Sequence, residues 1–183
     1  TVGCLVKNNL IPVFADVLNT YCIDENQIES LVTDKTVAIL VPNLLGNLPN
    51  WIKIREIANK YNLIVKGILN KGDAHKAINL GADAIIISNH GGRQLDSAIS
   101  SIKALENIRP HVKGDCKLFV DSGFRRGTDI IKALALGADF VFIGRPFLYA
   151  ASIAGIAGVT HAINLLKEEI DRDMALLGVN EID

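Results

Sequence analysis

Leu80-Gly-Ala-Asp-Ala-Ile-Ile-Ile-Ser88 is echoed 56 residues later by Leu136-Gly-Ala-Asp-Phe-Val-Phe-Ile-Gly144. In each stretch a helix end is followed by a glycine that stops the helix and then by a run of apolar, mostly β-branched or aromatic residues typical of a buried strand. The echo therefore predicts repeated βα units. Such units build either a β/α barrel or a doubly wound sheet, and the echo alone does not choose between the two.

The same alternation extends along the rest of the chain and predicts parallel strands joined by helices. Six strands are expected, at residues 11–17, 37–41, 63–68, 84–88, 118–121 and 140–143. Helical periodicity fills the intervals, and a final helix is expected over about residues 158–177. Asp73 and Asp129 occupy positions typical of helix N-caps, and Gly81 and Gly137 occupy positions typical of helix stops.

Composition indicates a globular protein with a sizeable core. Of the 183 residues, 49% are hydrophobic and 21% are charged, which excludes a disordered chain. The net charge of -1 argues against nucleic acid as a partner. The length fits one domain, yet it falls short of the roughly 250 residues of a complete eight-unit barrel.

Cysteine usage and apolar run lengths bear on location. Cys4, Cys22 and Cys116 show neither a paired framework nor a C-x-x-C spacing, so neither disulfides nor a zinc site is expected. No uninterrupted apolar run approaches the ~18 residues of a membrane span, so no transmembrane segment is expected. We therefore predict a cytoplasmic protein, with peripheral association with the inner membrane as an alternative.

Chemistry-bearing residues follow four of the predicted strands. They are Lys66-Gly67, Ser88-Asn-His-Gly-Gly-Arg93, Asp121-Ser-Gly-Phe-Arg-Arg-Gly127 and Gly144-Arg-Pro146. Because the carboxyl ends of parallel strands meet at one edge, these residues are expected to gather around one ligand site. The last two are Gly/Arg segments that run into helices. They predict a phosphate site, since glycine lets backbone amides approach and arginine adds paired donors.

Simpler interpretations compete for several of these residues. His90 considered alone could be an ordinary loop histidine, but its place between Asn89 and two glycines, three residues before Arg93, favours a functional role. Surface or loop positions are expected for His75, His111, His161 and Arg126. Asp83 and Asp139 precede strands at the opposite edge, where a structural role is expected.

From about residue 64 onward, the motifs containing Lys66, Ser88 to Asp96, Asp121 to Gly127 and Ile143 to Pro146 resemble the FMN-dependent α-hydroxy-acid dehydrogenases and oxidases. The Asp-Ser-Gly-Phe-Arg-Arg-Gly form is most similar to the lactate and mandelate dehydrogenase branch. The resemblance implies the C-terminal half of a (β/α)8 TIM barrel that binds FMN.

The same resemblance implies individual roles. His90 would be the base that takes a proton from a 2-hydroxy acid, Arg93 would bind the substrate carboxylate, and Lys66 would stabilise negative charge on the reduced flavin. Ser88 would contact the flavin ring, and Asp121 the ribityl chain. The implied cofactor-binding set is Lys66, Ser88, Asp121, Ser122, Gly123, Phe124, Arg125, Gly144 and Arg145, the last members holding the phosphate.

The first third resembles a different family. Ile11-Pro-Val-Phe-Ala-Asp-Val17, Lys35-Thr-Val-Ala-Ile-Leu-Val41 and Leu45-Gly-Asn47 are similar to part of the PLP-dependent sugar aminotransferases and dehydratases. The resemblance implies an aminotransferase-like segment at residues 1–65, contributing two extra βα units, before an FMN-type half-barrel at residues 66–183. A matching Schiff-base lysine motif is missing, so PLP chemistry is not expected.

Two functional hypotheses follow. The first is FMN-dependent oxidation of an L-2-hydroxy acid of the lactate, mandelate or glycolate kind, with oxygen or a quinone as electron acceptor and homo-oligomerisation left open. The second is a catalytically silent chimeric or truncated βα module that keeps at most a phosphate- or FMN-binding edge.

Overall fold

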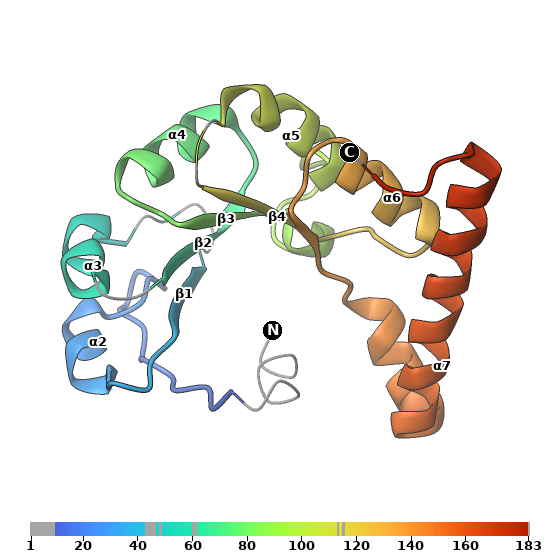
Figure 1. Cartoon of the computed structure of the whole chain (residues 1–183). Helices are drawn as coiled ribbons and strands as arrows, with labels where there is room; N and C mark the ends of the chain where they lie inside the picture. The colour runs from blue at the N-terminus through green and yellow to red at the C-terminus, as the bar shows by residue number, and fades with distance from the viewer. Residues whose placement is uncertain are drawn as a thin grey trace.

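A computed structural model describes residues 10–42, 47, 49–59, 62–112, 114 and 116–182. Their centre is a five-stranded, all-parallel sheet in the order β1-β2-β3-β4-β5 (Figure 1). The strands are β1 (Ala38–Pro42), β2 (Asn62–Ile68), β3 (Ala84–Ile87), β4 (Lys117–Val120) and β5 (Phe140–Val141). Each strand pairs with the next one along the chain, without the reversal of order that marks a doubly wound sheet. This topology selects the barrel type of βα repeat.

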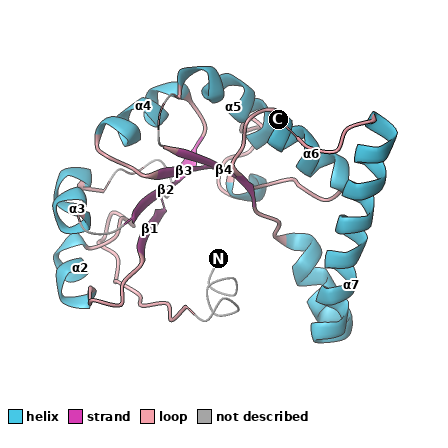
Figure 2. Ribbon diagram, viewed as in Figure 1, coloured by secondary structure: helices cyan, strands magenta, loops and turns pink. Residues whose placement is uncertain are grey.

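Helices connect successive strands and cover the outer face of the curved sheet (Figure 2). They are α2 (Glu25–Leu31), α3 (Trp51–Ala58), α4 (Lys71–Asn79), α5 (Ser101–Ile108), α6 (Gly127–Ala135) and α7 (Arg145–Leu177). Two short 3-10 helices, η1 (His90–Gly92) and η2 (Arg109–His111), flank α5. In Figure 1 the helices from α2 to α6 form an arc, so the described residues make part of a barrel wall.

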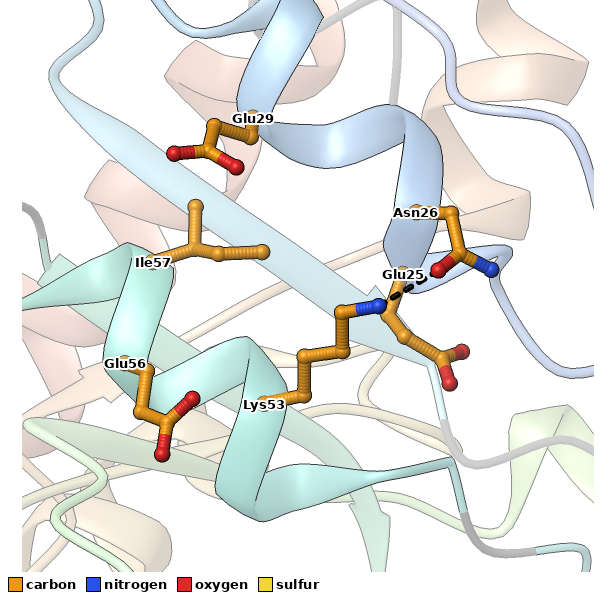
Figure 3. A pocket seen from close by; sticks show the side chains of 6 residues that line it. All are labelled: Glu25, Asn26, Glu29, Lys53, Glu56 and Ile57. Atoms are coloured by element: carbon orange, nitrogen blue, oxygen red, sulfur yellow. Dashed lines mark hydrogen bonds between the residues drawn. The ribbon is translucent and has the colours of Figure 1, made fainter.

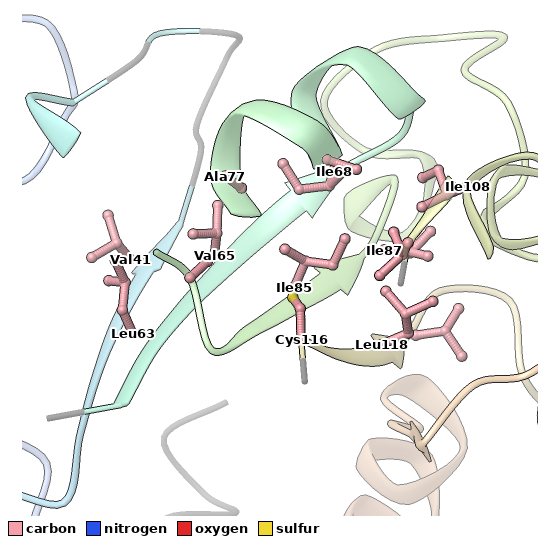
Figure 4. Close-up of a cluster of buried hydrophobic side chains, with 14 of the residues drawn as sticks. Val41, Leu63, Val65, Ile68, Ala77, Ile85, Ile87, Ile108, Cys116 and Leu118 are labelled. Atoms are coloured by element: carbon pink, nitrogen blue, oxygen red, sulfur yellow. The ribbon is translucent and has the colours of Figure 1, made fainter. Parts of the chain in front are cut away.

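The core lies between the sheet and this arc of helices (Figure 4). Alternation places Leu63 and Val65 of β2 in it, whereas Ile64 and Lys66 stay partly accessible on the inner face. A register shift between Lys66 and Ile68 places Ile68 in the core as well. All four residues of β3 are buried, as its unbroken apolar run predicts. The largest side chains with less than 2% exposure include Ile54, Leu63, Ile85, Ile87, Leu105, Ile108 and Leu118.

The repeated Leu-Gly-Ala-Asp stretches build the same helix-to-strand connection twice, although β5 is shorter and more exposed than β3. Gly81 and Gly137 have φ values of 85° and 89°, which glycine adopts without the strain of a Cβ. The Asp83 carboxylate accepts the backbone N–H of Leu63 at 2.8 Å, and the Asp139 carboxylate accepts that of Leu118 at 2.9 Å. Each aspartate thus ties the start of one strand to its neighbour, which confirms the structural role predicted for both.

Residues 11–17, predicted as a strand, are irregular, so that prediction was wrong and the described residues contain five strands. The segment has only an isolated antiparallel bridge between Val17 and Ile23. Ile11 is 88% exposed and Phe14 is 70% exposed, and Pro12 has no N–H to donate. An apolar, β-branched run forms a strand only where a neighbouring strand and a core accept it. The predicted features Cys4 and Leu45-Gly46 lie outside the described residues.

The helix starts also differ from the prediction. Asn70 caps α4 by accepting the N–H of Asp73 at 2.9 Å, and Asp73 is the third helical residue. Asp129 has the same place in α6, where its carboxylate accepts the amides of Arg125 and Arg126. Carboxylates in a first turn serve the unpaired amides as well as a cap does, so composition alone could not separate the two positions.

The last helix is longer than predicted and contains a break. α7 begins at Arg145, but Ala154 and Gly155 have non-helical backbone angles, and Figure 1 shows the chain changing direction within α7. By length and composition alone, α7 is long and apolar enough to cross a membrane, which the lengths of the uninterrupted apolar runs did not predict. The break at Ala154 and Gly155 divides this helix.

Glu169 attaches α7 to the start of α6. Its carboxylate accepts the Gly127 amide at 2.7 Å and pairs with the Arg126 guanidinium at 2.7 Å, while its side chain is 17% exposed. Arg126 is exposed as predicted, and this ion pair is its contact. The Gly127 amide, followed by the Arg126 guanidinium, lowers the pKa of Glu169 from its ordinary value of 4.5.

We expect Glu169→Gln to lower the free energy of unfolding by about 1–2 kcal/mol at pH 7, because the charge-assisted bonds become neutral. A carboxylate with a lowered pKa contributes its full stability above pH 4.5 and loses it as the pH falls through the lowered value. The difference from the parent should therefore shrink at pH 3. Urea unfolding at both pH values measures it, with exposed Glu168→Gln as the control; an equal difference at both values would contradict the assignment.

Candidate functional site

The carboxyl ends of β2, β3 and β4 bring three predicted site residues into contact. Lys66 Nζ donates to Ser88 Oγ at 3.0 Å and forms an ion pair with the Asp121 carboxylate. Ser88 has no solvent exposure, and the side chains of Lys66 and Asp121 are only 14% and 23% exposed. A charge pair shielded from water in this way has a stronger field than one at the surface. We call the residues at this edge the rim. It consists of Lys66 near the end of β2 and of residues 88–93, 121–127 and 144–146, which follow β3, β4 and β5.

The turn after β3 carries His90. Asn89 stabilises it by accepting the amides of Gly91 and Gly92, each at 3.1 Å, as asparagine does in Asx turns. His90 has a φ of 55°, in the left-handed region that few non-glycine residues adopt. Its amide donates to Ser88 Oγ at 3.1 Å, so the turn is bound directly to the buried end of β3.

A second contact binds the turn to β4. Ser122 Oγ accepts the Gly91 amide at 2.9 Å and donates to the Asp121 carboxylate at 2.8 Å. From the far side, the Arg145 guanidinium donates to the Gly91 carbonyl oxygen. The φ of Gly91 is 73°, a value that favours glycine, and a Cβ there would displace the Arg145 guanidinium, because it would lie 2.6 Å from Nη2.

Other predicted members lie at the rim without joining this network. Arg93 and Arg125 are exposed, and the guanidinium of neither makes a hydrogen bond or ion pair with the described residues. A Cβ built on Gly123 or Gly144 meets no atom within 4 Å, so the backbone there is open to an approaching ligand. Phe124 is different, because its side chain is 5% exposed and packs in the core. Only the Phe124 backbone can face the rim.

The sequence analysis assigned no supporting role to Asn89 or Ser101. Ser101, at the start of α5, is 1% exposed and accepts the Asn89 amide at 3.2 Å, and Asn89 Nδ2 donates to the Ile99 carbonyl at the same distance. The sequence signal for Asn89 was its position before two glycines. Ser101 offered no such signal, because its partner lies 12 residues away and only the fold brings them together.

Among the described residues, neither a reactive thiol nor a metal-binding cluster is found elsewhere. Burial, then the nearby carboxylates of Asp83 and Asp139, raises the pKa of the Cys116 thiol to about 11, so it stays protonated and unreactive at neutral pH. Within the described residues, no cluster of three or more histidine, cysteine or carboxylate side chains suits a metal ion.

A polar hollow lies between α2 and α3, away from the rim (Figure 3). Its lining consists of Glu25, Asn26, Glu29, Lys53, Glu56 and Ile57. Lys53 Nζ donates to Asn26 Oδ1, which joins the two helices across it.

The parallel sheet with polar groups gathered at its carboxyl edge defines part of a β/α barrel, whose rim is the candidate ligand site. Comparison with known families agrees: the family of FMN-dependent dehydrogenases matches residues 17–183. The chain belongs to this family.

Curated relatives match about two thirds of this chain. An L-lactate oxidase of Nostoc sp. (strain PCC 7120) is 52% identical over 120 residues, which are 66% of this chain and 33% of the relative. An L-lactate dehydrogenase of Ectopseudomonas mendocina (strain ymp) is 49% identical over 120 residues, 66% of this chain and 32% of the relative. The chain thus spans about a third of the length of these curated relatives.

Solved structures agree with the fold. A mutant mandelate oxidase with the monooxide FMN adduct superposes with a TM-score of 0.67 at 41% identity, covering 72% of this chain and 42% of that one. Mandelate oxidase with benzoyl-formic acid gives the same score and identity, covering 40% of its own chain. The predicted α/β half-barrel is therefore confirmed.

The resemblance of residues 1–65 to aminotransferases is not supported. The FMN-dependent dehydrogenase match begins at residue 17, and β1 and β2 belong to the same sheet as the rim strands. Strand β2 runs without interruption through the boundary predicted at residue 65. Short βα units share apolar strands and polar helix faces whatever their family, which explains a misleading local likeness.

Proposed function

We propose that this chain supplies the FMN-binding and proton-transferring part of an enzyme that oxidises an L-2-hydroxy acid of the lactate, mandelate or glycolate kind to the 2-oxo acid. The observation that carries the proposal is the shielded Lys66–Asp121 pair, bound through Ser88 to the His90 turn. It places a cation, a carboxylate and a histidine-bearing loop at one edge.

The residues present fit FMN in their chemistry. Open glycine backbone at Gly123 and Gly144 with exposed Arg125 nearby suits a phosphate, and Lys66 suits the electron-rich edge of a flavin. Bound FMN would supply the two-electron acceptor. The contact of Arg145 with the Gly91 carbonyl assigns its guanidinium to the loop in this structure, so phosphate binding by Arg145 stays a prediction.

The protein's own residues have distinct proposed tasks. His90 takes the proton of the substrate 2-hydroxyl while the C2–H bond breaks, and that hydrogen leaves with its electron pair to the two-electron acceptor that bound FMN would supply. Arg93, whose exposed guanidinium makes no hydrogen bond or ion pair with the described residues, binds the substrate carboxylate through two parallel hydrogen bonds. Lys66 holds its charge beside the site, where it stabilises the negative charge that builds up on reduction. The use of oxygen or a quinone, homo-oligomerisation and a cytoplasmic location stay predictions.

One observation favours the alternative of a silent module. The sheet has five strands and two unpaired edges among the described residues, whereas a closed barrel of this type has eight. A rim without the opposite wall would keep the phosphate contacts and lose the contacts on the other side of the cofactor.

Titration of the purified chain with FMN, and separately with inorganic phosphate, distinguishes the two proposals. The enzyme proposal expects saturable quenching of FMN fluorescence, followed by loss of the oxidised flavin absorbance when L-lactate or L-mandelate is added without oxygen. Phosphate binding without FMN binding would support the silent module and contradict the enzyme. FMN binding without bleaching by a 2-hydroxy acid would contradict the catalytic role alone.

A further inference from the structure

Ser122 has an unusual backbone and three polar neighbours. Its φ is 77°, a left-handed value that costs a serine energy and that persists where surrounding contacts enforce it. Its hydroxyl lies 2.9 Å from the Gly91 amide, 2.8 Å from the Asp121 carboxylate and 3.4 Å from Ser88 Oγ. The side chain is thus turned toward the His90 turn.

The direction of these hydrogen bonds follows from the groups involved. The Gly91 amide can only donate and the Asp121 carboxylate can only accept. The Ser122 hydroxyl therefore donates its proton in a hydrogen bond to Asp121, and its oxygen accepts the hydrogen bond from the Gly91 amide. Ser88 makes the parallel connection, accepting from the His90 amide and from Lys66. Two successive amides of the turn are therefore each held by a serine hydroxyl, and each serine is oriented by one member of the ion pair.

We propose that Ser122 is a positioning residue for His90. Its hydroxyl is oriented by its hydrogen bond to the Asp121 carboxylate, and it accepts the Gly91 amide. These two bonds hold the left-handed backbone of His90 in place. The proposal rests on the proposed function for the role of His90 as base. Its conformational part concerns the flavin-free chain and stands apart from turnover.

Two substitutions separate the hydroxyl from the backbone strain. Ser122→Gly removes both, because glycine accepts a φ of 77° freely, whereas Ser122→Ala removes the hydroxyl and keeps the strain. We expect the glycine variant to keep the unfolding midpoint of the parent, yet its Gly91 amide should exchange with solvent about tenfold faster, as loss of one hydrogen bond implies. The alanine variant should show faster exchange and a lower midpoint.

Ser97→Gly is the matched control. Ser97 also has a positive φ, of 58°, but its hydrogen bond in the structure is through its amide, to the Asp96 carboxylate. Its replacement relieves strain without touching the network, so Gly91 exchange should match the parent.

A second readout follows the imidazole in the flavin-free chain. In ¹H–¹⁵N spectra the ring signals of His90 should move in Ser122→Gly while those of exposed His161 do not, and with FMN bound kcat should fall about tenfold at unchanged KM. Unchanged Gly91 exchange and unchanged His90 ring signals in Ser122→Gly would overturn the proposal. If the parent chain neither binds FMN nor turns over, the proposed function fails, but amide exchange and the His90 ring signals still decide the role of Ser122.

Discussion

Replacing His90 with alanine is expected to slow reduction of bound FMN by a 2-hydroxy acid by about 10²- to 10⁴-fold, the usual contribution of a positioned base. His90 follows β3 in a turn held by the Ser88 hydroxyl and the Asn89 amide side chain. Those contacts involve main-chain amides, which alanine keeps. FMN affinity should therefore change little, so the loss should appear in the single-turnover rate of flavin bleaching.

The control for this substitution is His161→Ala, on the exposed surface of α7. It should bleach at the parent rate. Because a proton acceptor is what the first variant lacks, a small added imidazole should restore part of the rate. Bleaching by His90→Ala within threefold of the parent would remove His90 from the role of base and leave the family assignment untouched.

Leu118→Ala should have the largest effect on stability, lowering the free energy of unfolding by about 2–5 kcal/mol. Leu118 lies in β4 with no solvent exposure, among the buried side chains that join the sheet to its covering helices (Figure 4). Truncation leaves a cavity, and because β4 is hydrogen-bonded to β3 on one side and β5 on the other, the backbone cannot move in to fill it. Its amide bond to Asp139 belongs to the main chain and persists, so the loss reports packing.

Urea unfolding followed by far-UV circular dichroism measures this change. Leu148→Ala, at a position 67% exposed in α7, is the matched control and should cost less than about 0.5 kcal/mol. Equal losses at both positions would mean that the sheet and its helices do not form the main core.

The Leu-Gly-Ala-Asp echo shows what local sequence could predict. Its glycine stops occur as predicted because they depend on residues within a few positions, and β3 is buried as its unbroken apolar run predicts. The second strand differs: β5 is only two residues long, and Phe140 is 53% exposed because β5 lies at the edge of the sheet. The run at residues 11–17 shows the limit. Its composition is that of a strand, but strand formation needs a neighbour and a core, which that composition cannot report.

The site divides in the same way. The sequence by itself determined the βα order, the FMN-dependent dehydrogenase motifs and the residue types at the strand ends, since chain order and periodicity encode them. Only the tertiary structure decided that the strands pair in sequence order, that Phe124 packs in the core, and that Ser122 and Arg145 both hold Gly91. Ser122 lies 31 positions from Gly91 in the sequence, and Arg145 lies 54 positions from it. Such contacts depend on how the strand ends converge, and no local sequence pattern records that convergence.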